Sequence, residues 1–468
     1  MIRQAARAAR QGATLAEIVA RADAFLGSEQ AIDLGFCRWT TPEMLALERQ
    51  VVVLASQPVA APLRADPAAV SAAIASRPSL SAEQRTMVTE LCGSGRPVEV
   101  VIGHAGAGKT FSLDAVRDAF EASGHRVIGT SLAARAALEL QASAGIRSVT
   151  AHTLLAGINA GRVRLGPGDT LVVNEAGMVG TRQLAALAAE TARAGAKLIL
   201  VGDPRQLPPV EAGGLFASLG ERVPVIELAE NRRQVDPEER AITAALRRGQ
   251  AELAVQRLDA HGRLTVAHNS DALRDQLVLD WWEHRSAGRD VVMGGVHRED
   301  VRDLNFRAHA LLETSGQLGP VVAEVDGRRF CVGDQVRALR NRYDLGILNG
   351  QVGEVTGADR DRLCVRVDGR DVRLPVEYAA AHLDHSYART VHKTQGLTCD
   401  VALLLGDDTL YAELGYTGLT RGRAENHLYT VVSAADAEGD GLDRLTRALA
   451  TSRAKTAAVD YLEPPVRA

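Results

Sequence analysis

Short apolar runs alternate with amphipathic stretches from about residue 97 to residue 432. Residues 97–102, 126–130, 171–173 and 197–201 are apolar runs of strand length, and 111–122 and 133–144 have helical spacings. The alternation returns with apolar runs at 225–228, 291–294, 401–405 and 427–432. This pattern predicts an α/β fold on parallel sheets, whose ligand sites lie at the carboxyl ends of the strands.

Other parts of the chain follow different patterns. Residues 1–78 are Ala-rich and helical by spacing, and Thr41 followed by Pro42 predicts a helix that runs to Ser56. Residues 319–377 carry short strand patterns with Gly and Asp turns, and Asn349–Gly350 is a hairpin signal. We therefore expect a helical region (1–78), a first α/β domain (79–224), a second (225–318 and 378–435), a small β-barrel inserted in it (319–377), and a C-terminal helix and tail (436–468).

Composition and charge narrow the class of protein. The 468 residues are 46% hydrophobic and 24% charged with a net charge of −4, which is ordinary for a globular protein and excludes a generally basic coat. The five cysteines form no C-x-x-C pair, so we expect neither a disulfide framework nor a zinc site and favour a reducing cytoplasm. No apolar run reaches the ~18 residues of a membrane span.

The strongest chemical motif is the octapeptide 103–110, which fits G-x-x-x-x-G-K-[ST] between a predicted strand and a predicted helix. Its backbone N–H groups would surround an anion at a helix N-terminus. Lys109 would reach the β- and γ-phosphates, and the Thr110 hydroxyl would ligate Mg²⁺. The predicted ligand is ATP with Mg²⁺, held by Gly103, Gly106, Ala107, Gly108, Lys109 and Thr110.

Two further positions concern the same site. Glu175, at the end of the strand 171–173, can orient an attacking water. Gln84 allows two interpretations that spacing alone does not separate. It is either the N3 residue of a capping box with Ser81, or a reader of the adenine edge through its amide.

Several motifs then follow in a fixed order. They are Asn-Glu-Ala-Gly-Met-Val (174–179), Gly-Asp-Pro-Arg-Gln-Leu-Pro-Pro (202–209), Glu-Asn-Arg-Arg-Gln (230–234), Tyr-Ala-Arg-Thr-Val-His-Lys-Thr-Gln-Gly (387–396) and Tyr-Thr-Gly-Leu-Thr-Arg-Gly-Arg (416–423). With the P-loop, this series resembles superfamily 1 DNA helicases, most of all the helicase part of TraA/TraI/TrwC-type conjugative relaxases and, beyond them, the RecD group. The resemblance extends from about residue 84 to residue 432.

The resemblance implies two RecA-like domains and roles for individual residues. The implied catalytic set is Lys109, Glu175, Gln206 as γ-phosphate sensor, and Arg233 and Arg421 as arginine fingers. Gln395 and Gly396 would also bind the nucleotide. The implied DNA contacts are Thr130, Ser131, Thr150, His152, Thr390, His392 and Lys393. It further implies 5′→3′ movement on single-stranded DNA, an insertion that packs beside the strand, and a relaxase or another conjugation or repair protein as partner. A plain structural insert is the competing view of residues 319–377, and the oligomeric state stays open.

One position departs from the family pattern. The usual Asp-Glu pair is Asn174–Glu175 here, and asparagine keeps an oxygen acceptor but loses the charge that attracts Mg²⁺. Our hypothesis is Mg²⁺ binding that is weakened at Asn174, which would act through water, but not abolished, because Thr110 and Glu175 remain. The alternative is a hydrolysis-impaired, nucleotide-gated DNA-binding subunit without unwinding activity. A small-molecule kinase or GTPase is disfavoured, because no N-K-x-D signal follows the P-loop.

Overall fold

The first of two parallel sheets carries the P-loop. The computed structural model describes residues 12–58, 63–325, 327–432 and 440–465. The first sheet has the strand order β5-β4-β6-β7-β3-β8 and every pairing in it is parallel. Its strands are β3 (Val98–Gly103), β4 (Arg126–Ser131), β5 (Ser148–Thr150), β6 (Asp169–Asn174), β7 (Lys197–Gly202) and β8 (Val225–Leu228). All six carboxyl ends therefore point to one edge of the sheet.

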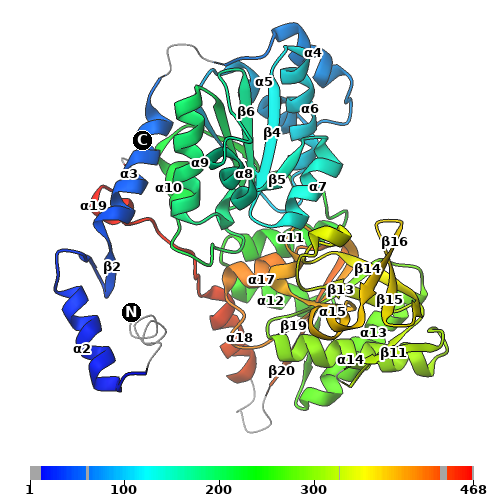
Figure 1. The fold of residues 1–468 in the computed structure, drawn as a ribbon. Coiled ribbons are helices and arrows are strands. Elements are labelled where there is room, and N and C mark those ends of the chain that lie inside the picture. The colour runs from blue at the N-terminus through cyan, green and yellow to red at the C-terminus, as the bar shows by residue number, and fades with distance from the viewer. Residues whose placement is uncertain (1–11, 59–62, 326, 433–439, 466–468) are drawn as a thin grey trace.

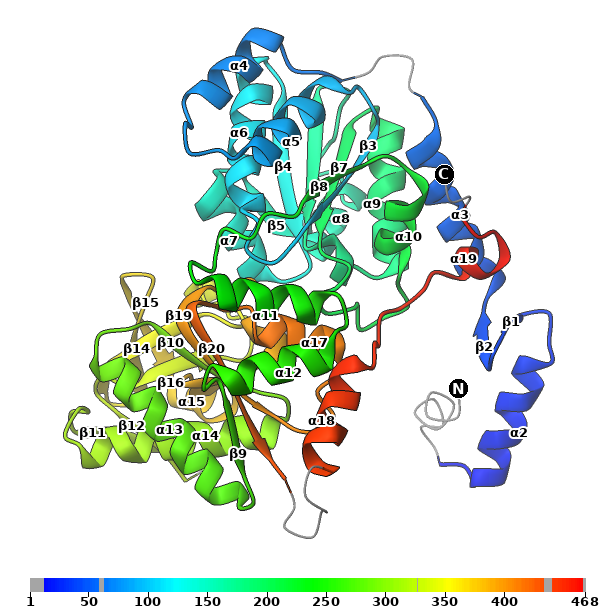
Figure 2. The ribbon, with the colours of Figure 1, turned by 180° about the vertical axis from the view of Figure 1, so that it is seen from behind.

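Helices cover both faces of this sheet (Figures 1 and 2). Successive strand residues face opposite cores, so Val100 packs with one set of helices and Val101 with the other. One face carries α4 (Pro67–Ala75), α5 (Ala82–Gly93), α6 (Lys109–Ala122) and α7 (Ala134–Ala144). The other carries α3 (Pro42–Ser56), α8 (Ala151–Asn159), α9 (Thr181–Ala194) and α10 (Leu215–Arg222). Burial on both faces explains why these strands read as continuous apolar runs.

The second sheet has the order β18-β10-β19-β20-β9 and is also parallel throughout. Its strands are β9 (Leu264–Ala267), β10 (Val291–Gly295), β18 (Ala388–Thr390), β19 (Cys399–Gly406) and β20 (Gly422–Val431). Helices α13 (Ser270–Ser286) and α14 (Arg298–Thr314) cover one face. Helices α11 (Pro237–Arg247), α12 (Ala251–Ala260), α17 (Ala412–Gly418) and α18 (Asp440–Ala450) form a core that also takes in Ala105 of the P-loop. The two halves thus share a hydrophobic contact beside the P-loop.

Two predicted boundaries are wrong. Strand β8 was expected to open the second domain at residue 225, but it pairs with β3 and is the edge strand of the first sheet. The insertion was expected to end at residue 377, but β17 (Leu383–His385) pairs with β13 and extends it. The N-terminal region is not purely helical either, since β1 (Ile32–Gly35) and β2 (Arg38–Thr40) form a hairpin after α2 (Leu15–Leu26).

The insertion is an antiparallel sheet with a core of its own. Its order is β16-β15-β14-β13-β17, with β13 (Gln335–Ala338), β14 (Val352–Asp359), β15 (Arg362–Val367) and β16 (Arg370–Pro375), and β11 (Val321–Val325) pairs with β12 (Arg328–Cys331) beside it. Phe330, Val355, Leu363 and Tyr378 from α15 (Val376–His382) meet in its core. The order of the sheet has two ends, β16 and β17, so closure into a barrel stays a prediction.

Segments from near the two ends of the chain meet on the first half. Helix α19 (Ala458–Leu462) packs on α3 through Val459 and Leu45, and the backbone N–H of Val459 donates to the buried Glu48 carboxylate at 2.9 Å. Helices α3 and α4 lie in the two cores of the first sheet and therefore belong to the first half, whereas α2 and the β1–β2 hairpin project away from it (Figures 1 and 2).

A buried ion pair at the amino ends of β3 and β7 offers a test of this packing. Lys197 Nζ lies 3.1 Å from Glu99 Oε1, and both side chains are at most 1% exposed. We expect Glu99→Leu to lower the free energy of unfolding by about 3 kcal/mol, because it leaves the Lys197 charge buried without a partner. The double variant Glu99→Leu/Lys197→Met should recover most of the loss in urea unfolding. Equal losses in both variants would contradict this account.

Candidate functional site

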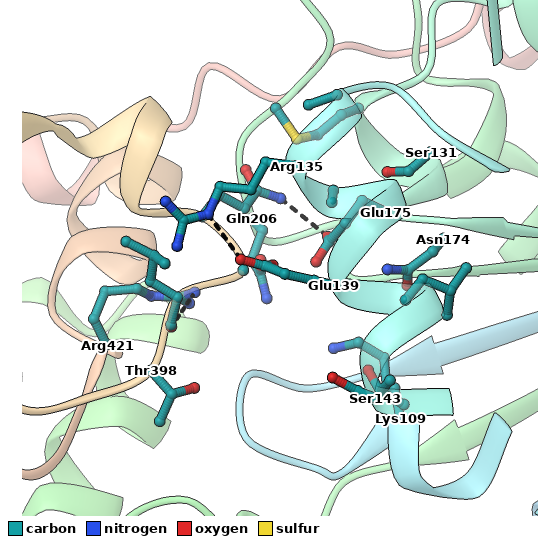
Figure 3. A pocket seen from close by; sticks show the side chains of 18 of the residues that line it. Lys109, Ser131, Arg135, Glu139, Ser143, Asn174, Glu175, Gln206, Thr398 and Arg421 are labelled. Carbon is teal, nitrogen blue, oxygen red and sulfur yellow. Dashed lines mark hydrogen bonds and ion pairs between the residues drawn. The ribbon is translucent and has the colours of Figure 1, made fainter. Parts of the chain in front are cut away.

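A cavity of about 640 Å³ lies between the two halves. The P-loop, Ser131 after β4, and Asn174 and Glu175 after β6 line it from the carboxyl edge of the first sheet. The second half contributes the segment 389–398 and Arg421, and the insertion contributes Arg337 and residues 349–350. Figure 3 shows Lys109 and Asn174 on one side of the cavity and Arg421 across from them. The predicted edge of the sheet is therefore where the polar residues gather.

The P-loop lysine folds back over its own loop. Lys109 Nζ donates to the carbonyl of Gly103 at 2.8 Å and to that of His104 at 3.1 Å. A Cβ on Gly103 would lie 2.4 Å from the Lys109 side chain, so only glycine leaves room for it. Burial lowers the pKa of Lys109, and the charges of Arg233 and Arg421 lower it further against the opposing effect of Glu175. An anion in the cavity would relieve this repulsion.

Arg233 is held directly against the P-loop. The backbone N–H of Arg232 donates to the Gly106 carbonyl at 3.0 Å. Gly106 has φ +82°, and a Cβ there would lie 2.6 Å from Arg233 Cβ, so both its backbone and its surroundings require glycine. The segment that carries Arg233 runs from β8 of the first sheet to α11. Arg233 therefore lies in the connection between the first sheet and the helices of the second half, and its role as an arginine finger of the second domain stays a prediction.

The second arginine comes from the far side of the cavity. Arg421 precedes β20 and is 2% exposed, and Arg233 Nη1 donates to the carbonyl of the neighbouring Thr420 at 2.6 Å. Burial lowers the pKa of Arg233 to about 9, helped by the like charge of Arg421. Within the described residues, neither arginine forms an ion pair with a carboxylate. The half-buried Arg233 and the buried Arg421, which lack counter-ions within the described residues, create with Lys109 a strong preference for an anionic ligand.

Glu175 is held in a strained backbone conformation. Its φ of 55° and ψ of 42° lie in the left-handed region, which costs a non-glycine residue of order 1–3 kcal/mol and is typical of functional sites. Its Oε2 accepts from Gln395 Nε2 of the second half at 3.0 Å. With the Thr110 hydroxyl and the Asn174 amide oxygen, Glu175 lines the cavity with the oxygen donors that Mg²⁺ prefers. These three side chains are therefore suitable ligands for Mg²⁺, although Glu175 is the one that carries a negative charge.

A hydrogen-bond relay joins the halves behind the P-loop. The Tyr416 hydroxyl of α17 accepts from Ala105 N at 3.0 Å and donates to Asp203 at 3.1 Å. Asp203, which follows β7, is fully buried and pairs with Arg247 of α11 at 2.5 Å. Its carboxylate also lies 3.5 Å from Gln206 Nε2, and Gln206 lines the cavity. The proposed phosphate sensor is thus connected to a buried carboxylate that touches both halves.

Gln84 forms the capping box. Ser81 N donates to Gln84 Oε1 at 3.0 Å, and Gln84 N donates to the Ser81 hydroxyl. The amide nitrogen of Gln84 donates to the Ala107 carbonyl of the P-loop at 3.0 Å. The side chain is 3% exposed, and a contact with adenine would require it to exchange these partners, so that contact stays a prediction.

The predicted DNA contacts separate into two groups. Ser131, His392 and Lys393 line the cavity. The other four do not: Thr130 donates to the Val149 carbonyl, Thr150 caps α8, His152 is exposed on that helix, and Thr390 precedes α16 (Val391–Thr394). Thr130 is fully buried and holds β4 to β5, so its hydroxyl is closed to a ligand in this structure. The roles of the remaining three stay predictions.

Some lining residues escaped the sequence analysis. Arg135 and Glu139 of α7 form an i,i+4 ion pair at 2.9 Å that reaches into the cavity, as Figure 3 shows. Their spacing was a readable signal. The insertion contributes Arg337 and Asn349, and β18 contributes Arg389. No local sequence pattern predicts that these distant segments line one cavity.

Comparisons with known proteins agree with this geometry. A family model described as "AAA domain" matches residues 79–269. The conjugal transfer protein TraA of Rhizobium radiobacter is 34% identical over 401 residues, which are 84% of this chain and 36% of TraA. The ATP-dependent RecD2 DNA helicase of Deinococcus radiodurans is 31% identical over 359 residues, 74% of this chain and 48% of RecD2. The chain is a relative of the TraA and RecD group of superfamily 1 helicases. It spans between a third and a half of the lengths of these two relatives.

Solved helicases of this superfamily share the fold. Bacteroides Pif1 bound to ssDNA gives a TM-score of 0.51 at 20% identity, covering 75% of this chain and 92% of that one. Pif1 from Candida albicans gives 0.51 at 18% identity, covering 82% and 98%. The predicted α/β fold with parallel sheets, like the RecA-like domains of Pif1, is therefore confirmed. Among the described residues, no helix has the length and apolarity to cross a bilayer.

The relay through Tyr416 can be tested by removing one oxygen. We expect Tyr416→Phe to lower the free energy of unfolding by ~1–3 kcal/mol, because it leaves the buried Ala105 N–H without its acceptor and Asp203 without a donor. Urea unfolding measures the change. Tyr411→Phe is the control, because no hydrogen bond of that hydroxyl occurs in the described part of the chain. A loss no larger than that of the control would contradict the assigned role.

Proposed function

We propose that the protein is an ATP-dependent DNA helicase or translocase that moves along single-stranded DNA. The observation that supports this most is the meeting of Lys109, Glu175, Gln206, Arg233 and Arg421 around one cavity between two parallel sheets. The family relation supports the same activity, since the RecD2 relative is named an ATP-dependent DNA helicase.

The geometry suggests how hydrolysis would proceed. Lys109 and the P-loop N–H groups bind the β- and γ-phosphates of ATP. Glu175 orients a water for in-line attack and accepts its proton, while Arg233 and Arg421 neutralise the charge that develops on the γ-phosphate. Thr110 and Asn174 would hold Mg²⁺, which would supply positive charge against the phosphates.

Coupling to DNA would use the contacts that cross the cavity. Glu175 accepts from Gln395, and Lys393 lies two residues before Gln395 in the same segment. A change at the attacking water therefore reaches the segment proposed to grip the strand. Loss of the γ-phosphate removes the anion that holds the cations together, and the halves separate. The grip should tolerate any sequence, because it uses phosphates.

The family relation also supports the finer parts of the proposal. Movement is proposed to be 5′→3′, as the resemblance implies. The TraA relatives are named conjugal transfer proteins, so plasmid conjugation is the proposed context, with a relaxase as candidate partner and DNA repair as the other context. The alternative is a nucleotide-gated DNA-binding subunit without unwinding, and the observation that favours it is Asn174.

An ATPase assay with and without single-stranded DNA, followed by unwinding of duplexes with 5′ or 3′ overhangs, tests the function. We expect DNA-stimulated hydrolysis and unwinding of the 5′-overhang substrate only. Lys109→Ala should abolish both, because it removes the cation that reaches the phosphates, and an unchanged thermal unfolding midpoint would show that the variant folds. Turnover retained in Lys109→Ala would overturn the site assignment.

Asn174→Asp tests the effect of the missing carboxylate. We expect the Mg²⁺ concentration for half-maximal ATPase activity to fall by roughly tenfold, which corresponds to ~1.4 kcal/mol of added attraction. Asn159→Asp adds the same charge on the exposed end of α8 and is the control. Indistinguishable Mg²⁺ titrations would contradict weakened Mg²⁺ binding. Single-turnover hydrolysis that is absent with and without DNA would favour the alternative function.

A further inference from the structure

A second group of cations lines the same cavity apart from the P-loop. Arg337 comes from β13 of the insertion, Arg389 from β18, Lys393 from α16 and Arg135 from α7. Figure 3 shows Arg135 and its partner Glu139 away from Lys109. Three separate parts of the chain thus bring positive charge to one place, and the nucleotide chemistry described above uses none of these arginines.

Arg337 is buried with unpaired hydrogen-bond donors. It is 5% exposed, and its Nε and Nη1 atoms have no hydrogen-bond partner among the described residues. The Ser131 hydroxyl lines the same cavity, is 1% exposed and likewise has no partner there. Buried polar groups without partners are rare in native proteins and point to a missing ligand. A buried guanidinium needs that ligand to be an anion.

The electrostatics separate this group from the phosphate end of the cavity. Burial lowers the pKa of Arg389 to about 10, and the charges of Arg135 and Arg337 act in the same direction. Burial likewise lowers the pKa of Lys393 to about 8, with Arg337, Arg298 and Arg389 adding to it. The charges that act on Lys109 are different ones, namely Glu175, Asp203, Arg233 and Arg421. The cavity therefore has two groups of cations, and within each group the like charges repel one another.

We propose that Arg337 and Arg389 form an anion subsite that holds a backbone phosphate of the single strand. The inference rests on the proposed function and adds residues of the insertion to the grip. A guanidinium offers two parallel donors to a phosphate, and Ser131 and His392 add neutral donors beside it. The subsite takes Arg337 from the insertion, Arg389 from the second sheet and Ser131 from the first sheet. The bound strand would therefore contact both of the halves that the proposed ATP cycle moves relative to each other. The insertion is then a component of the grip as well as a structural addition.

Salt dependence of DNA binding tests the subsite. We expect Arg337→Gln and Arg389→Gln each to reduce the slope of log K against log salt for oligo-dT by ~0.7, the contribution of one phosphate contact on a single strand. Arg337→Lys keeps the charge and should keep the slope. Arg366→Gln is the matched control, because Arg366 is an exposed arginine of the same insertion, paired with Asp371. A thermal unfolding midpoint close to that of wild type is expected for Arg337→Gln, since Nε and Nη1 of Arg337 have no hydrogen-bond partner to lose in the described part of the chain.

Nucleotide binding by the same variants is the second measurement, and it distinguishes a DNA phosphate from a nucleotide phosphate. A fluorescent ADP should bind Arg337→Gln and Arg389→Gln as it binds wild type, and should not bind Lys109→Ala. Unchanged DNA slopes in both glutamine variants, with wild type binding DNA, would overturn the subsite and leave the proposed function standing. Lost nucleotide affinity with normal DNA slopes would assign the subsite to a nucleotide phosphate and overturn the proposal. A wild-type protein that binds ADP but no oligo-dT would overturn the proposed function and this inference together.

Discussion

Uncompensated positive charge between two parallel sheets is the constraint around which the site is arranged. Lys109 and Arg233 lie half-buried beside the buried Arg421, and the Glu175 carboxylate lines the same cavity. Such a cluster persists only because other contacts hold the halves in place. The hydrophobic core shared by Ala105 and α17, and the hydroxyl of Tyr416, do so without adding charge at the cavity. A bound polyphosphate would supply the negative charge that these cations lack. Binding of the anion would therefore favour the closed arrangement of the two halves.

The parts that could be predicted from sequence are those whose signals are local. The P-loop is a contiguous strand, turn and helix start, and its motif predicts its own geometry. Thr41 and Pro42 open α3 as expected, with the Thr41 side chain accepting from Met44 N. Strand β8 was recognised as a strand but assigned to the wrong sheet, because four apolar residues carry no information about their neighbour. Sheet membership depends on long-range pairing, which periodicity does not encode.

The same distinction applies to the site. Glu175 and Arg421 line the cavity and were named from the sequence, because each belongs to a motif whose place in the fold is the same from one family member to another. Arg337 was missed because it lies in a β-strand of ordinary composition, and its importance arises only where β13 meets β18 and α7. Gln84 shows that a local signal can be read correctly and still miss a second contact. A capping box and a contact with the P-loop carbonyl of Ala107 use the same amide, so the spacing of Ser81 and Gln84 could not reveal the second contact.

Asn174 fits a site that relies on arginines more than on metal. A carboxylate there would attract Mg²⁺, but it would also oppose the negative phosphates, and unit charges ~4 Å apart interact by ~4 kcal/mol at an effective dielectric constant of ~20 before desolvation is deducted. With asparagine the cavity carries one negative charge fewer, so under the proposed function Lys109, Arg233 and Arg421 would offset more of the phosphate charge. The strained backbone of Glu175 lies beside Asn174, and the Glu175 carboxylate accepts from Gln395 of the second half. In the proposed mechanism, Asn174 would therefore shift phosphate stabilisation from the metal toward the arginines, and with it toward closure of the two halves.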